Sequence, residues 1–413
     1  MTRDCGGNDN GFAGLGVSLF FIGRLKERGI RTPEEIQRRV IPRLFRGERV
    51  LFSSPTGTGK TFAYLIPVFQ KMMEPAAVSG NGCNTDRAGQ APQAKLSAEA
   101  LILAPTYELC SQIKQEAEFL LSGAASFKVS LLIGSGALSR QIETLKKDRP
   151  RVLVGNPGRV LQLVKMGKLR LGNLRFLVLD EADRLSADEL YGETRELVSL
   201  IRSGYTAACS ATLPDRCRER LLSLMGEKSG IFVEETRTNE ILRDRIEHWA
   251  FFCEERDKIG LLRSFLAALR PRKALVFTSR GAQVGNIVSK LQYHGISALG
   301  LYGDMDKRAR KQAMDDFRRG RSAVLVASDL AARGLDIPDV SHIISLDTGA
   351  DPDAYIHRAG RTARAGKRGI MATFGDEAEM RALLRLEKKL GIIVYPKELY
   401  AGKVRAPSPM DHN

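Results

Sequence analysis

A series of short apolar runs most limits what this chain of 413 residues can fold into. Each is a continuous Val, Leu or Ile stretch without polar alternation, which is typical of strands buried on both faces of a parallel sheet. Helical patterns lie between them, so we predict two α/β domains whose parallel sheets are covered by helices. The runs form an early series at 50–54, 101–105, 130–134, 152–156, 176–180 and 206–210, and a later series at 274–279, 298–303, 323–329, 342–347 and 370–375.

The two series are separated by a polar segment, EETRTNEILRDRIEH at 234–248, which we interpret as a hinge. Residues 75–98 are rich in Ala, Gly, Ser and Pro and are expected to form a flexible surface loop, with a functional insertion as the alternative. The predicted organisation is an N-terminal domain (1–235), an interdomain linker (236–248), a C-terminal domain (249–395) and a loosely ordered basic tail (396–413).

Composition limits the partners and the compartment. Lys and Arg number 64 against 48 Asp and Glu, a net charge of +16 that suits a polyanion. The six cysteines are scattered without Cys-x-x-Cys spacing, which argues against zinc and disulfides and favours a reducing, cytoplasmic setting. The N-terminus has no apolar signal core, and no run approaches the roughly 18 apolar residues of a membrane span, so no membrane association is expected.

A glycine-rich turn follows the first strand, in SSPTGTGKTFAYLIPVFQ at 53–70. The backbone N–H groups of Thr56, Gly57, Thr58 and Gly59 can face a polyanion, and a helix predicted at 61–73 aims its positive end at the same place. Lys60 is placed to reach the β- and γ-phosphates of a nucleotide, and the Thr61 hydroxyl is placed to bind Mg²⁺. The strict pattern has Gly where this chain has Ser54, and a chance turn is the alternative.

Three carboxylates end the strand at 176–180, in FLVLDEADRL. Nucleotide-bound Mg²⁺ would explain why Asp180 is tolerated at the end of a buried strand, and we assign it to the metal shell. Glu181 is placed to orient and deprotonate the attacking water. The alternative interpretation is an acidic helix cap.

With these motifs in order, the chain resembles the DEAD-box ATP-dependent RNA helicases from Phe12 to about Phe374. The resemblance implies two RecA-like domains, each a mostly parallel sheet with helices on both faces, with ATP and Mg²⁺ as cofactors and RNA as partner. It assigns Gln37, in GIRTPEEIQRRVIP at 29–42, to the adenine edge, and Phe12 to stacking near the base. A side-chain amide both donates and accepts, which suits adenine.

Further motifs acquire roles through the same resemblance. Ser210 and Thr212 of SAT would link hydrolysis to duplex opening, although a helix cap is the ordinary alternative. In the second domain, Asp336 would contact the ribose and His357 would couple to the first domain. Arg361 and Arg364 would act as arginine fingers on the γ-phosphate, against the alternative of a solvated basic stretch.

The resemblance also assigns contacts with the RNA sugar–phosphate backbone. Glycines and hydroxyls suit this role, because they allow phosphates to approach without reading bases. Tyr107 stands where the family usually has Arg, so RNA affinity or its salt dependence is expected to be lower. The assigned residues are Pro105, Thr106, Gly134, Gly136, Pro157, Gly158, Arg159, Thr278, Arg280 and Ser328, the last in place of the usual Thr.

The sequence thus predicts an ATP-dependent RNA helicase that acts on short duplexes. An ATP-gated RNA clamp with little unwinding would carry the same motifs, and a DNA helicase of the same superfamily is a second alternative. The RNA target, protein partners and oligomeric state are not predicted.

Overall fold

The continuous apolar runs form parallel strands. The structure is a computed structural model that divides into two compact units, with the main boundary between residues 236 and 237. The described residues are 11–55, 57–74, 98–124, 127–172, 174–201, 205–226, 231–235, 238–302, 305–332, 337, 339–348, 351–363 and 367–407.

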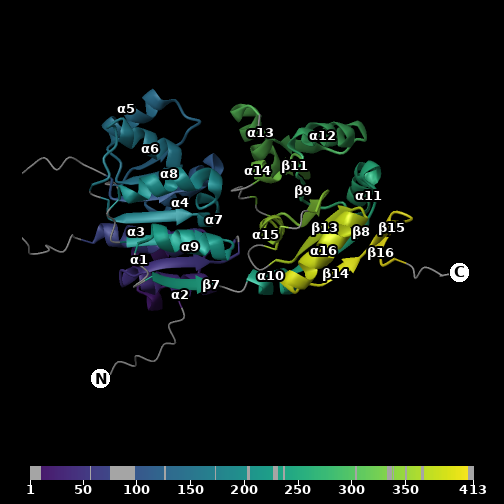
Figure 1. The fold of residues 1–413 in the computed structure, drawn as a ribbon, viewed down its shortest axis with the longest axis horizontal. Coiled ribbons are helices and arrows are strands. Elements are labelled where there is room, and N and C mark those ends of the chain that lie inside the picture. Colours follow the sequence, from purple (N-terminus) through teal and green to yellow (C-terminus); the bar gives the residue numbers. More distant parts are fainter. Residues whose placement is uncertain are drawn as a thin grey trace, which may run out of the picture. The chain divides into compact units, whose positions relative to one another are not determined.

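The first unit, coloured purple to teal in Figure 1, contains a parallel sheet. The sheet has seven strands in the order β3-β4-β2-β5-β6-β1-β7. Its strands are β1 (Arg49–Ser53), β2 (Ala100–Leu103), β3 (Val129–Leu132), β4 (Val152–Gly155), β5 (Phe176–Asp180), β6 (Tyr205–Ser210) and β7 (Ile231–Glu235). Its α-helices are α1 (Leu19–Glu27), α2 (Glu35–Phe45), α3 (Lys60–Met73), α4 (Tyr107–Leu120), α5 (Leu138–Asp148), α6 (Pro157–Lys165), α7 (Ala182–Leu185), α8 (Asp188–Ser199) and α9 (Asp215–Leu224).

Helices cover both faces of this sheet. Side chains of α1 to α4 pack with one set of strand residues, including Val178 and Cys209, in one core. The alternate strand residues, including Leu177 and Ala208, pack with α6 to α9 in a second core. Because both alternating sets are buried, each strand shows a continuous apolar run.

The second unit repeats the plan, with a seven-stranded parallel sheet in the order β10-β11-β9-β12-β13-β8-β14. The strands are β8 (Ile246–Phe252), β9 (Ala274–Thr278), β10 (Ala298–Leu301), β11 (Val324–Ser328), β12 (His342–Ser345), β13 (Gly369–Gly375) and β14 (Val394–Pro396). The α-helices are α10 (Thr238–Arg245), α11 (Lys258–Leu269), α12 (Val284–Tyr293), α13 (Lys307–Arg318), α14 (Asp329–Ala332), α15 (Pro352–Ala359) and α16 (Glu377–Leu390).

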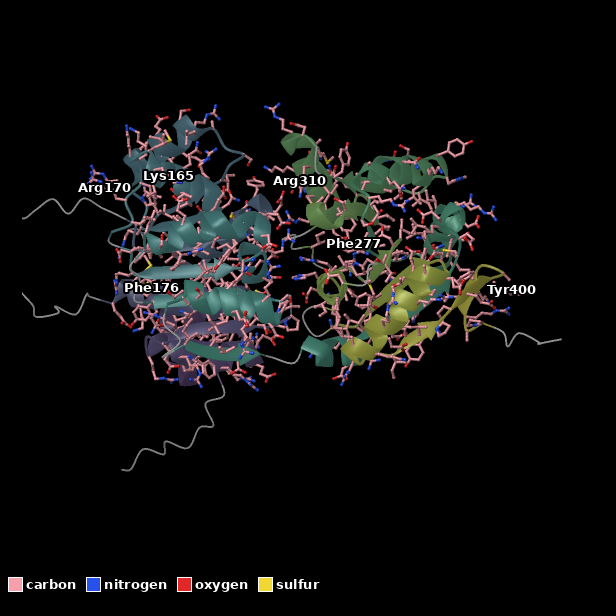
Figure 2. All side chains as sticks on the ribbon, viewed as in Figure 1. Lys165, Arg170, Phe176, Phe277, Arg310 and Tyr400 are labelled. Carbon is pink, nitrogen blue, oxygen red and sulfur yellow. The ribbon has the colours of Figure 1, made fainter. Side chains whose placement is uncertain are left out.

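This second sheet is also covered on both faces. Residues of α10 and of α13 to α16 share one core with alternate strand residues such as Phe277, and α11 and α12 share the other. Figure 2 shows Phe277 within this unit and Tyr400 on its exposed C-terminal hairpin. Both predicted series of strands, and the two-unit α/β plan, are confirmed.

Secondary structure occurs at both ends of the second unit. The segment expected as a linker at 236–248 contains α10 and the beginning of β8, an interior strand. Within it Leu242 is buried, while its neighbours Arg243 and Asp244 are exposed. In the expected tail, β15 (Glu398–Tyr400) pairs antiparallel with β16 (Lys403–Arg405).

Two further observations concern the remaining sequence predictions. Of the flexible loop expected at 75–98, residues 75–97 lie outside the described residues, as does the end of the tail at 408–413, whereas Ala98 is buried. Among the residues that the structure describes, the helices are too short or too polar to cross a lipid bilayer.

Candidate nucleotide and RNA sites

Three neighbouring strands bring the predicted nucleotide motifs of the first unit together. The strands β5, β6 and β1 are adjacent in the sheet and parallel. The glycine-rich turn follows β1, the acidic cluster ends β5, and Ser210 ends β6. In the strand register Asp180 lies beside Cys209, and Ser53 lies beside Ser210. Ligands bind at this carboxyl edge in open α/β sheets.

The glycine-rich turn has the backbone that its sequence requires. Gly57 and Gly59 have φ angles of 84° and 80°, in the left-handed region that side chains disfavour. A Cβ on Gly59 would lie 2.3 Å from Gln37 Nε2, so the position also lacks space for a side chain. Thr56 lies outside the described residues, and the Thr58 hydroxyl donates to the Pro55 carbonyl at 2.7 Å.

The Gln37 side chain joins α2 to this turn. Its Nε2 donates to the Gly59 carbonyl at 3.0 Å, and its Oε1 accepts from the Glu34 N–H at 3.0 Å in a capping box. The side chain is 2% exposed. Gln37, which is predicted to contact the adenine edge, therefore also connects the N-terminus of α2 to the glycine-rich turn. Phe12 is 3% exposed and packs in the apolar core, so its ring is not presented for stacking in this structure.

Lys60 opens α3 and is directed back into the turn. Its Nζ donates to the carbonyl of Ser54, the residue that replaces the usual glycine. Burial lowers the pKa of Lys60, and the nearby negative charges of Asp180 and Glu181 act in the opposite direction.

Asp180 is a buried carboxylate whose two oxygens both accept hydrogen bonds. The Tyr64 hydroxyl donates to Oδ2 at 2.7 Å, the Cys209 thiol donates to Oδ1 at 3.2 Å, and the Glu181 N–H donates to Oδ1 at 2.8 Å. Burial raises the pKa values of Tyr64 and Cys209 well above their ordinary values, and the charge of Asp180 raises them further. Tyr64 is also hydrogen-bonded to Thr61.

The acidic cluster and Thr61 fit a magnesium site of the nucleotide-bound type. Mg²⁺ prefers oxygen ligands and keeps several waters, so one carboxylate and one hydroxyl suffice when phosphates supply the rest. Asp180 and Thr61 are such a pair, and both contact Tyr64. Within the described ranges, no group of three or more His, Cys, Asp or Glu side chains is arranged to hold a metal, so a cage made of protein side chains alone does not occur there.

Glu181 has a backbone conformation that is rare for a residue with a side chain. Its φ and ψ are 48° and 52°, at the N-cap of α7, where the chain turns sharply after β5. Left-handed backbone at a residue other than glycine stores strain and occurs often at functional sites. The side chain is half-buried beside Asp180.

The SAT motif lies close to this cluster in the sheet. The Ser210 hydroxyl accepts from the Thr212 N–H at 3.3 Å, and Ser210 is fully buried. The Thr212 hydroxyl is buried and makes no hydrogen bond within the described residues. Neither residue caps the following helix, because α9 begins at Asp215 and its N-cap is Pro214. These contacts test neither assigned role.

The predicted RNA residues of the first unit form one braced group. The Arg159 guanidinium donates to the Gly136 carbonyl at 3.1 Å and to the Gly134 carbonyl at 2.7 Å. Asn156 Oδ1 accepts from the Gly134 N–H at 3.2 Å. The structure thus brings the GSG and NPGR motifs together, and Arg159 supports the loop. Pro157 is the first residue of α6, and a Cβ on Gly158 would lie 2.7 Å from the Glu193 carboxylate. Thr106, which follows Pro105, is the N-cap of α4. Tyr107, the first residue of that helix, is 43% exposed.

The predicted RNA residues of the second unit follow β9 and β11, which are paired strands. The Thr278 hydroxyl accepts from the Arg280 N–H at 3.2 Å, and the Ser328 hydroxyl accepts from the Ala331 N–H at 3.3 Å. The exposed Arg280 guanidinium forms an ion pair of 3.0 Å with Glu255.

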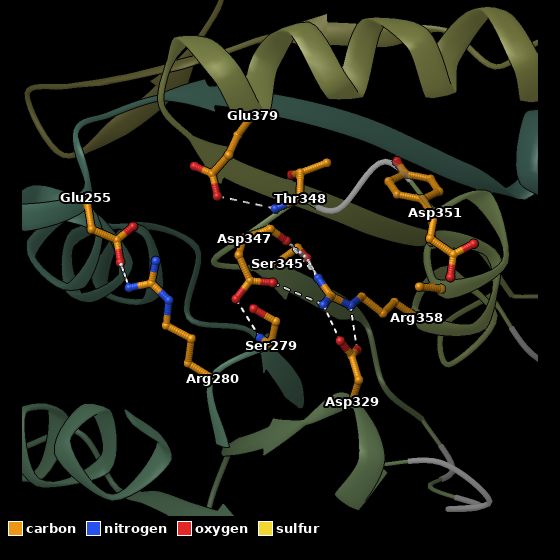
Figure 3. Close-up of a pocket in the computed structure, with 12 residues that line it drawn as sticks. Glu255, Ser279, Arg280, Asp329, Ser345, Asp347, Thr348, Asp351, Arg358 and Glu379 are labelled. Atoms are coloured by element: carbon orange, nitrogen blue, oxygen red, sulfur yellow. Dashed lines mark hydrogen bonds and ion pairs between the residues drawn. The ribbon is translucent and has the colours of Figure 1, made fainter. Parts of the chain in front are cut away.

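A cavity of about 340 Å³ opens at the carboxyl ends of these strands (Figure 3). Arg358 lies against it, is 6% exposed, and bonds Asp329, Ser345 and Asp347. Burial alone would lower the pKa of Arg358, but hydrogen bonds and charges from Asp329 and Asp347 outweigh burial and raise it. The cavity wall is therefore held by a buried ion-pair network.

The remaining predicted residues lie on or near α15. Arg361 is 5% exposed, and its Nε donates to the His357 carbonyl at 3.3 Å. His357 is half-buried. Asp336 and Arg364 lie outside the described residues.

Asn156 belongs to the NPGR motif at 156–159 that the family resemblance assigns to RNA contact. Sequence reasoning missed three further side chains that shape these sites: Tyr64, Cys209 and Arg358. A signal existed for two of them. Tyr64 follows Lys60 by four positions and so lies on the same face of α3. Cys209 occupies the same relative place in β6 as Asp180 in β5.

The glycine-rich turn follows one strand, and carboxylates end a nearby strand of the same parallel sheet. This combination defines a class of α/β protein that hydrolyses nucleoside triphosphates. Comparison with known proteins specifies that class. The family model "DEAD/DEAH box helicase" matches residues 34–220, and "Helicase conserved C-terminal domain" matches residues 257–366.

Individual relatives agree with the family models. The DEAD-box ATP-dependent RNA helicase CshC of Bacillus cereus is 33% identical over 93% of this chain and 92% of its own length. CshA of Geobacillus kaustophilus is 32% identical over 91% of this chain and 76% of its own. The structure of S. cerevisiae Dbp5 bound to RNA and ADP BeF3 is 26% identical, with a TM-score of 0.79, and the match covers 94% of this chain and 96% of that one. The chain therefore belongs to the DEAD-box ATP-dependent RNA helicases.

Proposed function

We propose that this protein hydrolyses ATP in an RNA-dependent manner and uses the reaction to unwind or remodel short RNA duplexes or RNA–protein complexes. The observation that carries the proposal is that the glycine-rich turn leading to Lys60 follows β1, while Asp180 ends β5 and Glu181 comes directly after it, so both motifs lie at the carboxyl edge of one parallel sheet. The family membership and the names of the relatives, which are ATP-dependent RNA helicases, support it.

In this proposal the nucleotide phosphates lie on the turn at 56–59 and on Lys60, and Gln37 reads the adenine edge. Asp180 and Thr61 would hold Mg²⁺, which when bound neutralises charge on the β- and γ-phosphates. The Ser54 carbonyl accepts from Lys60 Nζ, so the side chain is already directed into the turn before the phosphates arrive. Phe12 lines the base only if its ring leaves the core.

Hydrolysis breaks the β–γ bond. A water attacks the γ-phosphorus, Glu181 accepts the proton of that water, and ADP leaves with the electron pair of the broken bond. Arg361 and Arg364 of the second unit stabilise the charge that develops on the γ-phosphoryl oxygens. In the same proposal Asp336 contacts the ribose, and His357, Ser210 and Thr212 couple the nucleotide state to the duplex.

RNA is held through its backbone by the glycine, hydroxyl and basic groups of both units. These groups carry no base-reading code, so sequence specificity is expected to be low. The buried or half-buried free thiols among the described cysteines support a reducing, cytoplasmic setting.

Strand separation tests the proposal. A short fluorescent RNA duplex should be separated only with hydrolysable ATP and Mg²⁺, and RNA rather than DNA should stimulate ATP turnover. Tight, ATP-dependent retention of single-stranded RNA without strand separation would favour the RNA-clamp alternative. Stimulation by DNA alone would contradict both.

A further inference from the structure

Two buried side chains hold the Asp180 carboxylate from the face of the sheet that α3 covers. Tyr64, on α3, and Cys209, on β6, are both fully buried and belong to the same core. The phenol lies 2.7 Å from Oδ2 and the thiol lies 3.2 Å from Oδ1. An ionised carboxylate can only accept hydrogen bonds, so both side chains are donors.

These contacts restrict how Asp180 can be oriented. A carboxylate offers about four lone-pair positions. Tyr64, Cys209 and the Glu181 N–H occupy three of them, from α3, from β6 and from the chain directly after β5. Rotation of the carboxylate would break several hydrogen bonds at a buried site, which is costly. Counting the donors among the described residues, one acceptor position is left for a ligand.

Tyr64 also connects the two groups assigned to the metal. Its hydroxyl donates to Asp180, and it is hydrogen-bonded to Thr61. One side chain therefore sets the relative placement of the carboxylate on β5 and the hydroxyl on α3.

We propose that Tyr64 and Cys209 are positioning residues for the magnesium site, fixing Asp180 so that its remaining acceptor position serves the metal shell. The inference rests on the proposed function and adds to it two residues outside the recognised motifs. Outer partners of metal ligands change metal affinity or activity by about 10–100-fold when removed.

Matched variants separate hydrogen bonding from packing. Tyr64→Phe removes only the hydroxyl, and Cys209→Ala removes the thiol, whereas Cys209→Ser keeps a donor. Tyr205→Phe is the control for the first change, because Tyr205 lies at the opposite end of β6 from Cys209. Cys110→Ala is the control for the second, since that buried thiol bonds the Ala104 carbonyl instead.

The measurement is binding of a fluorescent, non-hydrolysable ATP analogue to the full chain as free Mg²⁺ is varied, with a second series in EDTA. For Tyr64→Phe the Mg²⁺ concentration at half-maximal binding should rise by about 10–100-fold. Cys209→Ala should shift it in the same direction, and Cys209→Ser should restore much of the loss. In EDTA, every variant should bind the analogue with the affinity of the wild type. In Mg²⁺, the two control variants should have the wild-type midpoint.

An unchanged Mg²⁺ midpoint in both Tyr64→Phe and Cys209→Ala would overturn the inference. An equal loss of affinity in Mg²⁺ and in EDTA would do the same, because it indicates packing only. If circular dichroism shows that Tyr64→Phe does not fold, the test rests on the comparison of Cys209→Ala with Cys209→Ser. Equal Mg²⁺ midpoints in these two variants would overturn the inference. A wild type that does not bind the analogue at all would instead contradict the proposed function.

Discussion

A buried carboxylate is costly unless its oxygens are hydrogen-bonded or its charge is matched, and Asp180 illustrates both conditions. Three donors bond its oxygens, and Lys60 supplies positive charge nearby. Its neighbour Glu181 is turned out of the strand direction by a left-handed backbone. Two adjacent acids thereby have different surroundings and are suited to different roles.

Glu181→Gln tests the role of general base at this scale. The amide keeps the size of the side chain but cannot accept a proton from water, so turnover of ATP should fall by about 10²–10⁴-fold. Nucleotide affinity measured by calorimetry should stay near the wild-type value. Glu219→Gln, an exposed position on α9, is the control. Near-normal turnover in purified Glu181→Gln would remove the assigned role.

At the scale of elements, one buried arginine connects α15 to the strand ends of the second sheet. Arg358 bonds Asp329 at the beginning of α14 and both Ser345 and Asp347 at the end of β12. These hydrogen bonds fix α15, the helix that contains His357. Arg361 follows two residues after the end of this helix. The position of these predicted functional residues therefore depends on a side chain that sequence reasoning did not single out.

Arg358→Ala should destabilise the second unit by about 3–5 kcal/mol, because two carboxylates lose their buried partner. The single tryptophan of the chain, Trp249, lies on β8 and reports unfolding of this unit by fluorescence in denaturant. Arg381→Ala removes an exposed ion pair with Glu377 and should leave the transition nearly unchanged. Equal transitions for the two variants would show that the network adds no stability.

The loop after β9 contains a second testable ion pair. Arg280, a predicted phosphate ligand, is bonded to Glu255, so the carboxylate competes with RNA for it. Glu255→Gln should raise affinity for single-stranded RNA and should steepen the salt dependence by about 0.7 per phosphate gained. Glu254→Gln removes the same charge one residue away and controls for long-range effects. Equal responses in both variants would contradict direct competition.

At the scale of the whole molecule, Lys60 and the assigned metal ligands belong to a different unit from the assigned arginine fingers. Lys60 and Asp180 lie in the first, and Arg361 and Arg364 belong to the second. ATP can favour a closed arrangement only if it interacts better with that arrangement than with an open one. Pairing the γ-phosphate with the arginines would provide this difference, so hydrolysis is expected to need both units.

Arg364→Ala tests this division of roles in the full chain. Loss of an arginine finger should lower turnover by about 10³–10⁵-fold. Binding of Mg²⁺–nucleotide should change little, because Lys60 and the assigned metal ligands, Thr61 and Asp180, belong to the first unit and are unaltered. Arg368→Ala, an exposed position four residues further on, is the control. If Arg364→Ala keeps near-normal turnover, a residue other than Arg364 must stabilise the charge of the transition state.

The sequence alone determined the two parallel sheets, the glycine turn and the acidic strand end, because continuous apolar runs and positive-φ glycines are local signals. It did not reveal β8, where buried positions such as Ile246 and His248 alternate with exposed Glu247. Nor did it reveal the donors around Asp180 or the bracing of Gly134 by Arg159, since these contacts join residues far apart in the chain. Only the tertiary structure decided them, because strand order and register set which distant side chains meet.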